Sequence, residues 1–324
     1  MRYKFIKAHG QDYPISLMCQ VLEVSVSGYY AWRKRPMSRR SQANQALVQQ
    51  IKASHQDSYG TYGSPRVQAD LVSQGLPCGR HRVARLMRQH GIRAKQRHHY
   101  RQTTVRNLAD PVAPNVLARQ FQAQAPNHKW VADLSYIPTQ EGDLYLATVM
   151  DLYSRKIVGW AMEDHLRTEL PLAALTMALN QRQPPAGLLH HSDRGSQYTS
   201  DLYQSVLNNY DCQPSMSRVG NCWDNAAMES FFGTLKSELT HHRRYRTRAQ
   251  AKSDIFLYIE GFYNRRRRHS SLGYLSPDQF ELIHNVSLNY PSTFSGEDHQ
   301  VIFPEKGDGR DWSTYVYRET NRLY

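Results

Sequence analysis

The sequence predicts a mixed α/β core preceded by an all-α region. Hydrophobic residues recur with a helical period in the first part of the chain, whereas β-rich runs separated by short turns begin at residue 129. The length of 324 residues suits two or three domains. We expect a helical region at 1–96, a linker at 97–128, an α/β core at 129–284 and a tail of unknown role at 285–324.

The excess positive charge is confined to the first two-fifths of the chain. The chain has 41 Lys and Arg against 28 Asp and Glu, a net charge of +13. Residues 1–128 carry a net +15, residues 129–284 balance to zero and residues 285–324 carry −2. A basic arm on a neutral core is typical of a nucleic-acid-binding protein, because basic side chains neutralise phosphates. The alternative is that the arginine-rich helices are solvated faces.

Residues 13–36 predict two short helices joined by a tight turn, the pattern of a helix-turn-helix. Met18 and Cys19 belong to the apolar stripe of the first helix. Ser25 or Ser27 is the expected N-cap of the second helix. This helix ends in three basic residues that we expect to contact DNA: Arg33, Lys34 and Arg35.

Residues 44–96 predict a second helical group. Ser64 is the expected N-cap of one helix, with Val67, Leu71 and Val72 as its buried stripe. The next helix has an outward face of arginines, as in a recognition helix that lies in a DNA groove. These arginines are Arg80, Arg82, Arg85 and Arg88.

The core is expected to alternate strands and helices in the order β-β-β-α-β-α-β-α. The expected strands lie at 129–138, 144–154, 156–162, 188–193 and 213–217. The expected helices lie at 168–182, 199–210 and 224–239. The first three strands form a meander, and the later strands join the sheet through helical crossovers.

Membrane insertion and a disulfide framework are not expected. No run approaches the ~20 apolar residues that a bilayer span requires, and the N-terminus lacks the apolar segment of a signal peptide. None of the four cysteines lies in a Cys-x-x-Cys pair, which argues against a zinc knuckle. We expect a cytoplasmic protein without a membrane partner.

Three carboxylates are candidates for a phosphoryl-transfer site: Asp133, Asp193 and Glu229. Asp133 lies between apolar residues of a core strand, where a carboxylate is costly to bury unless it is paired or binds a metal. Asp193 ends a strand, where open α/β sheets place ligands. Mg²⁺ prefers oxygen ligands, and two ions about 3.5–4 Å apart can stabilise both the attacking and the leaving oxygen.

Two further residues bear on this site. Asp151 follows an apolar strand as Asp133 does, and spacing alone does not separate the two. Lys236 lies seven residues after Glu229 and therefore on the same helix face, where it is placed to hold a phosphate.

Four segments resemble, in order, the integrase-like core of DDE transposases, and in particular the OrfB-type transposases of bacterial insertion sequences, relatives of retroviral integrases. The segments are WVADLSYIP (130–138), HSDRGSQY (191–198), GNCWDNAAMESFFGTLKSE (220–238) and YNRRRRHSSLGYLSP (263–277). Thirty-five residues separate Asp193 from Glu229, the spacing expected of this branch. The resemblance covers about residues 13–281, and the residues after 284 match nothing in the family.

The resemblance implies a ribonuclease-H-like fold and a metal-dependent DNA strand-transferase. Asp133, Asp193 and Glu229 are then the ligands of two Mg²⁺ (or Mn²⁺) ions, and Asp151 either has a structural role or supports these ligands. Water or a 3′-hydroxyl attacks a DNA phosphodiester in line, without a covalent protein–DNA intermediate. Strand cleavage at the element ends is followed by strand transfer, which in this branch first joins one end to the other.

The other residues of these motifs have alternative roles. Arg194, Asn225, Asn221 and Trp223 contact DNA or brace the metal ligands, or else they serve only as local turn and helix-capping residues. We assign Arg194, Asn225 and Lys236 to DNA binding. His191 either orients a water or is a satisfied strand histidine. The run Arg265–Arg268 either binds backbone phosphate or is a solvated helix end.

The resemblance also implies partners. These are double-stranded DNA, namely the inverted-repeat ends of the element and the target, and further copies of the chain in a homo-oligomer on DNA. A segment from an upstream reading frame is a possible partner or fusion. The location is then the bacterial cytoplasm, in association with the nucleoid. The alternatives are a catalytically inactive or domesticated DNA-binding regulator, and a nuclease of RNA–DNA hybrids on the same fold.

Overall fold

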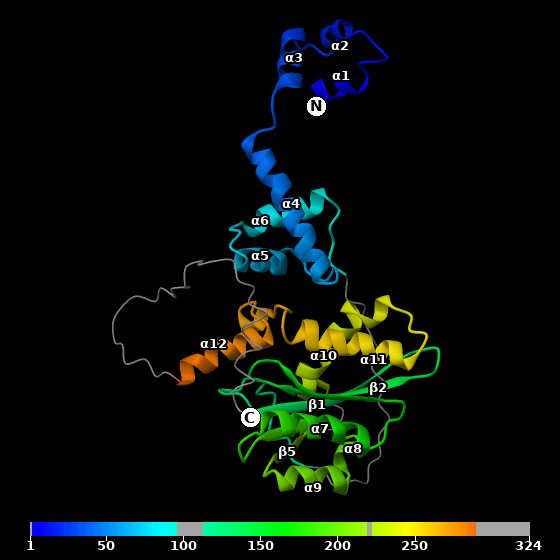
Figure 1. Ribbon diagram of the computed structural model, residues 1–324, viewed down its shortest axis with the longest axis vertical. Coiled ribbons are helices and arrows are strands. Elements are labelled where there is room, and N and C mark those ends of the chain that lie inside the picture. The colour runs from blue at the N-terminus through cyan, green and yellow to red at the C-terminus, as the bar shows by residue number, and fades with distance from the viewer. Residues whose placement is uncertain (1, 96–112, 219–221, 290–324) are drawn as a thin grey trace, which may run out of the picture. The chain divides into compact units, whose positions relative to one another are not determined.

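A five-stranded mixed sheet lies at the centre of the core. The fold is that of a computed structural model, which describes residues 2–95, 113–218 and 222–289, with the backbone alone for Cys222 and residues 285–289 (Figure 1). The strand order is β3-β2-β1-β4-β5. The strands are β1 (Lys129–Ile137), β2 (Leu144–Asp151), β3 (Ile157–Glu163), β4 (Leu189–Ser192) and β5 (Gln213–Met216).

The pairing of the strands confirms the predicted meander and crossovers. β1 is antiparallel to β2, and β2 is antiparallel to β3. β4 is parallel to both β1 and β5, and the helices between these strands make the crossovers. This is the ribonuclease-H-like arrangement that the resemblance implied.

Helices cover both faces of the sheet (Figure 1). One face packs against α7 (Glu169–Arg182), α8 (Ser196–Thr199) and α9 (Asp201–Asn209). The opposite face packs against α10 (Ala226–Glu238), α11 (Arg248–Phe256) and the π-helical η3 (Leu257–Tyr263). The chain then continues through η4 (Ser270–Leu272) into α12 (Pro277–Asn289).

The second helical group shares its hydrophobic core with the sheet. It consists of α4 (Arg39–Asp57), α5 (Ser64–Ser73) and α6 (Arg80–Gln89). Val67, Leu71 and Val83 are fully buried in the same cluster as Phe231 of α10. Two local predictions were wrong. Gly63 is the N-cap and Ser64 begins the helix, and Val72 is 46% exposed because it lies about 100° around the helix from Leu71.

The N-terminal helices have a small core of their own. They are α1 (Arg2–Ala8), α2 (Ile15–Val21) and α3 (Val26–Lys34), of which the sequence predicted the second and third. Ile6, Met18, Cys19 and Tyr29 are buried together. Ser25 is the N-cap of α3, since its Oγ accepts a hydrogen bond from the backbone N–H of Gly28 at 3.0 Å.

Residues 113–128 run along the core without forming a helix or a strand. Leu117 is buried in the main cluster, and the Ser215 hydroxyl accepts hydrogen bonds from the N–H groups of Val116 and Leu117. The rest of the expected linker, 97–112, lies outside the described residues, as do residue 96 and residues 290–324 of the expected tail. No helix among the residues described is both long and apolar enough to cross a bilayer.

Candidate active site

Strand pairing brings Asp133 and Asp193 side by side. In the parallel pair of β1 and β4, Trp130 is opposite His190 and Val131 is opposite His191. Asp193 follows the last residue of β4, and extending this register by two positions places it beside Asp133. Two candidates that are 60 residues apart in sequence therefore meet at one edge of the sheet.

The charges of Glu229 and Lys236 also act on the carboxyl group of Asp133. The pKa of Asp133 is well above its ordinary value, first because burial disfavours the charged form, and then because of the negative charges of Asp193 and Glu229. The hydrogen bond from Leu134 and the positive charge of Lys236 act in the opposite direction. The structure thus brings together all three carboxylates and the lysine that the sequence singled out.

Backbone amides orient both aspartates. The N–H of Leu134 donates to Asp133 Oδ1 at 2.8 Å, and the N–H of Gly195 donates to Asp193 Oδ1 at 2.9 Å. A Cβ atom at position 195 would lie 3.1 Å from Asp193 Oδ1 and 2.8 Å from Gln197 Oε1. A side chain at position 195 would therefore crowd the Asp193 carboxylate and the flexible end of the Gln197 side chain.

Two tyrosines at the site were missed by the sequence analysis. Lys236 Nζ lies 5.2 Å from the ring centroid of Tyr136, in a cation–π contact. Tyr198 is buried, and burial, Tyr203 and then the charges of Asp133 and Asp193 raise the pKa of its phenol well above the ordinary value. The only sequence signal for Tyr198 was its place at the end of the HSDRGSQY segment.

A buried carboxylate anchors the chain just before α10. Asp224 is fully buried, and the Arg218 guanidinium donates to both of its carboxylate oxygens, which holds the pKa of Asp224 well below its usual range. Arg119 and Asn115 also donate to Asp224. This anchor precedes Glu229 by five residues, so that it sets where the helix of Glu229 begins.

The motif residues assigned to DNA contact differ in their surroundings. Asn225 is buried, and its Nδ2 donates to the carbonyl oxygen of Ala132, next to Asp133, at 3.2 Å. This position fits the bracing alternative rather than DNA contact. Arg194 Nε donates to the carbonyl oxygen of Ser217 at 2.6 Å, and Trp223 is 64% exposed. Asn221 lies outside the described residues.

Asp151 and His191 are structural residues in the described core. Asp151 is fully buried and accepts hydrogen bonds from the backbone N–H groups of Asn127 and Tyr153 and from Arg182. Both ring nitrogens of His191 are bonded to hydroxyls, those of Ser215 and Ser217. Burial lowers the pKa of His191 to about 4, so the ring is neutral at pH 7.

The donor set fits a hard divalent cation. Asp133, Asp193 and Glu229 offer only carboxylate oxygens, all three are half-buried, and a cation would relieve their mutual repulsion. Their oxygens do not all lie within 4.8 Å of one another. A centre for two ions does not need such convergence, because its ligands are spread around a pair of ions about 3.5–4 Å apart.

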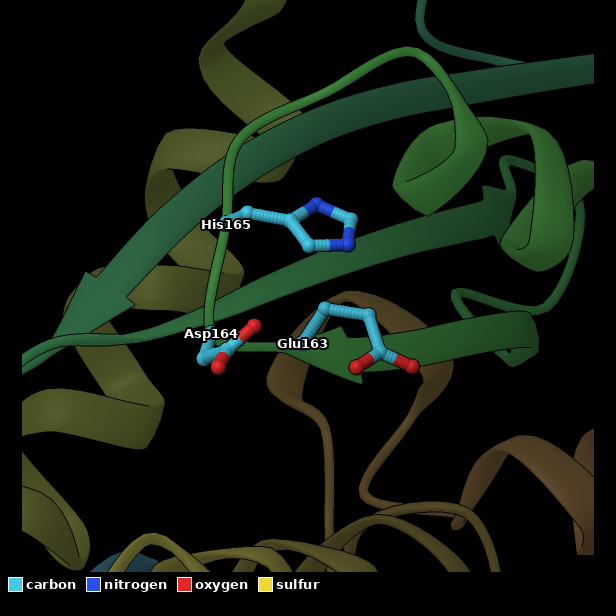
Figure 2. Close-up of side chains that lie close together, drawn as sticks. All are labelled: Glu163, Asp164 and His165. Atoms are coloured by element: carbon cyan, nitrogen blue, oxygen red, sulfur yellow. The ribbon is translucent and has the colours of Figure 1, made fainter.

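One other group of side chains has the spacing of metal ligands. Among the residues described, only Glu163, Asp164 and His165 have ligand atoms that all lie within 4.8 Å of one another. Figure 2 shows that they follow one another at the end of β3 and in the loop after it. Glu163 and Asp164 are exposed, and Glu163 lies 3.9 Å from Lys252 Nζ. We assign this group no role.

Most of the basic residues predicted to bind DNA are exposed. On α6, Arg80, Arg85 and Arg88 face solvent, while Val83 and Leu86 are buried on the other side. Arg82 is half-buried and donates from Nε to Asn44 Oδ1 at 2.9 Å, which makes it a packing residue of α4 and α6. At the end of α3, Arg33, Lys34 and Arg35 are all exposed.

The second half of the arginine run of residues 265–268 matches neither of its predicted roles. Arg267 and Arg268 are buried. Arg267 binds Glu238 through Nε and Nη2 at 2.9 and 2.8 Å, and Arg268 binds Asp70 at 3.0 Å. Both arginines are therefore structural, and only Arg265 and Arg266 are exposed.

Family models and relatives match most of the chain. An integrase core domain model matches residues 123–222, a second model of that description matches 210–277, and an HTH-like domain model matches 42–100. The chain is 42% identical over 283 residues to the transposase InsF for insertion sequence IS3A of Escherichia coli strain K12, covering 87% of this chain and 98% of that protein. It is 50% identical over 263 residues to an uncharacterized 31 kDa protein of insertion element IS600 from Shigella sonnei, covering 81% and 97%.

Two solved structures match the chain at low sequence identity. A chain of the simian T-cell lymphotropic virus intasome, solved with the PP2A regulatory subunit B56 gamma, is 14% identical with a TM-score of 0.44, covering 74% of this chain and 76% of that one. The HTLV-2 integrase catalytic core domain, solved with magnesium, is 16% identical with a TM-score of 0.38, covering 49% and 98%.

Proposed function

The chain belongs to the OrfB-type DDE transposases of bacterial insertion sequences, the family of the IS3 transposase InsF, and from this premise we propose how its residues carry out the reaction. As a transposase it is a polynucleotidyl transferase that acts on DNA. We infer that Asp133, Asp193 and Glu229 hold two divalent cations, Mg²⁺ or Mn²⁺. The observation that carries this proposal is the electrostatic convergence of Asp193, Glu229 and Lys236 on Asp133.

Each residue of the site has a distinct task in this proposal. The ions, when bound, supply activation of water or a 3′-hydroxyl and neutralise the charge that develops on the phosphoryl group. The amides of Leu134 and Gly195 keep the two aspartates in a fixed orientation. Lys236, held over Tyr136, lies where it can bind a phosphate of the DNA end. These groups suit strand cleavage at the element ends followed by strand transfer.

The exposed basic residues are proposed as the DNA contacts outside the core. Arg80, Arg85 and Arg88 form a continuous basic face on α6, as a recognition helix requires. Arg33, Lys34 and Arg35, which are exposed at the end of α3, are proposed as further contacts. Arg194 lies one residue after Asp193 and is a candidate for contact with the DNA end. Arg82 and Asn225 are proposed as positioning residues instead, because their side chains bond within the protein.

We also propose the DNA partners and the assembly that the reaction uses. The inverted-repeat ends and the target are the expected DNA partners, and joining two ends favours a homo-oligomer on DNA. The division into a helical region at 1–96, a linker at 97–128, a core at 129–284 and a tail at 285–324 remains a prediction. So do a role for an upstream-frame segment and a location in the bacterial cytoplasm near the nucleoid.

A cleavage and joining assay tests the proposal. Labelled DNA with the flanking repeat ends is incubated with the protein, with and without Mg²⁺. Asp193→Asn is the test variant, and Asp201→Asn, an exposed carboxylate at the start of α9, is the control. We expect Mg²⁺-dependent products from the wild type and the control, and a loss of about 10²–10³-fold in Asp193→Asn, the range for removing one charge-stabilising group.

If the assay gives no products, two further measurements identify the cause. Mg²⁺ should raise the melting temperature of the wild type and leave that of Asp193→Asn unchanged, because only a bound ligand stabilises the fold. Bound DNA without products, together with this metal effect, would call for the assay to be repeated with the upstream segment added. Full activity of Asp193→Asn would overturn the assignment.

A further inference from the structure

A cavity of about 380 Å³ lies against a second face of α10. Ala226, Ser230 and Thr234 line it, and their spacing of four residues places them on one face of the helix. Glu229 and Lys236 are seven residues apart and share a different face. None of Asp133, Asp193 or Glu229 lines the cavity, so it is separate from the carboxylate site.

The cavity has a polar mouth and a basic wall. Ser230, Ser270 and Ser271 are exposed at its rim. Three arginines from distant parts of the chain contribute to the wall: Arg66 of α5, Arg155 of the turn between β2 and β3, and Arg267 before η4. The remaining lining is largely buried and includes Phe231 and Tyr263. A ligand in this cavity would meet guanidinium groups and hydroxyls against an apolar floor.

Two of the three arginines share one carboxylate, that of Glu238. Glu238 accepts two hydrogen bonds from Arg267 and lies 3.8 Å from Arg66 Nη1. Arg155 donates from Nη2 to the carbonyl oxygen of Phe121 at 3.2 Å, and within the described chain it has no carboxylate partner. Three positive charges therefore face one negative charge in a half-buried site, an arrangement that costs free energy unless an anion binds there.

The protonation state of His269 reflects the same excess of positive charge. This lining residue is buried, and burial together with the charges of Arg267, Arg66 and Arg155 lowers the pKa of its ring well below the ordinary value. The ring is therefore neutral, and its Nε2 lies 3.4 Å from Arg267 Nη1, which donates to it. The protein adds no fourth charge here and leaves the positive potential of the arginines uncompensated.

We propose that this cavity binds a phosphate group, with Arg66 and Arg155 as its charged ligands and Ser230 and Ser270 as hydroxyl donors. Guanidinium groups bind tetrahedral oxyanions through paired N–H donors, and serine hydroxyls add further bonds. Two sources share this chemistry: a backbone phosphate of DNA that passes over α10, and a free phosphate anion. Only the first source rests on the proposed function.

The first experiment measures stabilisation by inorganic phosphate. The metal-free full-length protein is melted at constant ionic strength while phosphate replaces chloride. Phosphate should raise the melting temperature of the wild type, and Arg155→Gln should abolish this rise. Ser230→Glu, which places a carboxylate at the exposed rim, should abolish it too. Ser205→Glu, the same change at an exposed position of α9, should retain it.

The second experiment tests DNA as the source. Each phosphate contact contributes about −0.9 to the slope of log Kobs against log salt concentration on B-DNA. If a DNA phosphate occupies the cavity, Arg155→Gln should make this slope shallower by about 0.9, and Ser230→Glu should do the same. An unchanged slope with loss of phosphate stabilisation would identify a free anion as the ligand.

The two proposals can fail independently of each other. Asp193→Asn, which tests the metal site, should keep both the phosphate stabilisation and the salt slope of the wild type. If Arg155→Gln and Ser230→Glu match the wild type in both experiments, the anion site is overturned whatever the result of the joining assay.

Discussion

The carboxyl group of Asp133 is half-buried beside two other carboxylates. These surroundings affect both the stability of the protein and its proposed metal binding. Burial and the charges of Asp193 and Glu229 raise its pKa, so ionising it in the folded, metal-free state costs free energy. The same concentration of negative charge is what attracts divalent cations. At this residue, stability and the proposed metal binding are opposed.

Asp133→Asn should therefore stabilise the metal-free protein near pH 7. A raised pKa means that the folded state holds a proton that the unfolded chain has already lost. The penalty is absent below the unfolded pKa and grows as the pH rises toward the folded pKa. We expect the melting temperature of the variant in chelator to exceed that of the wild type at pH 7, by about 2–4 °C for each kcal/mol relieved, and to match it near pH 3.

The control for this prediction is Asp201→Asn, whose carboxylate is exposed. It should leave the pH dependence of the melting temperature unchanged. A lower melting temperature of Asp133→Asn at pH 7 would contradict the prediction. It would show that the amide costs more free energy in packing than the loss of the buried charge relieves.

At the scale of elements, the contact between α7 and β3 holds one side of the sheet. Gly159 of β3 lies so close to α7 that a Cβ there would be 2.1 Å from the carbonyl oxygen of Ala174 and 2.8 Å from Ala178 Cβ. Glycine is required here for close packing and not for an unusual backbone angle. The small residues at 174 and 178 complete this contact from the helix side.

Gly159→Ala should force α7 away from the sheet. We expect it to lower the free energy of unfolding by about 1–3 kcal/mol or more, as for overpacking in a dense core. Gly261→Ala in η3 is the matched control, since a Cβ there would meet no atom within 4 Å. Helix propensity predicts that this control is neutral or stabilising by up to about 1 kcal/mol. Chemical denaturation of both variants measures the difference, and equal stabilities would refute the steric argument.

At the scale of the whole molecule, charged pairs join the helix-turn-helix-like group to the core. Arg268 donates to Asp70 of α5, and its backbone N–H donates to the Tyr62 hydroxyl at 2.8 Å. Glu238, at the end of α10, is bonded by Arg267 and by the Tyr258 hydroxyl, and it lies 3.8 Å from Arg66 Nη1 of α5. A continuous apolar cluster underlies these contacts. The helix that carries Glu229 is therefore packed, through Glu238, against the same interface.

A double-mutant cycle of Asp70→Ala and Arg268→Ala should reveal strong coupling. The side chains are 21% and 10% exposed, so each single variant leaves a largely buried charge without its partner. We expect a coupling energy of roughly 1–3 kcal/mol from denaturation curves. The pair Arg243 and Asp254 serves as a comparison because Arg243 is 45% exposed, and it should couple by less than about 1 kcal/mol. Similar coupling energies in the two pairs would show that the pair of Asp70 and Arg268 stabilises the protein no more than an exposed pair does.

The sequence by itself determined the strands of the core, three of its helices and the candidate carboxylates. Strand alternation and helical periodicity are local signals, so all five strands and the helices α7, α9 and α10 could be predicted from them. Choosing Asp133 over Asp151 needed the order of several motifs, since both residues follow apolar strand segments. The helices α11 and α12, which follow the last predicted helix, were missed, and so was α1. The exact start of α5 was wrong by one residue because helix ends carry weak signals.

Only the tertiary structure decided what individual charged residues do. Arg268 belonged to the densest basic run of the core, yet its partner Asp70 lies 198 residues away. Asp224, Asn225 and Arg82 likewise acquired structural roles from partners outside their own segments. A local pattern encodes the period of burial, whereas the partner of a charged side chain is set by which distant elements the fold brings together. This is why the sequence placed the elements, and the packed structure separated ion pairs from surfaces available to DNA.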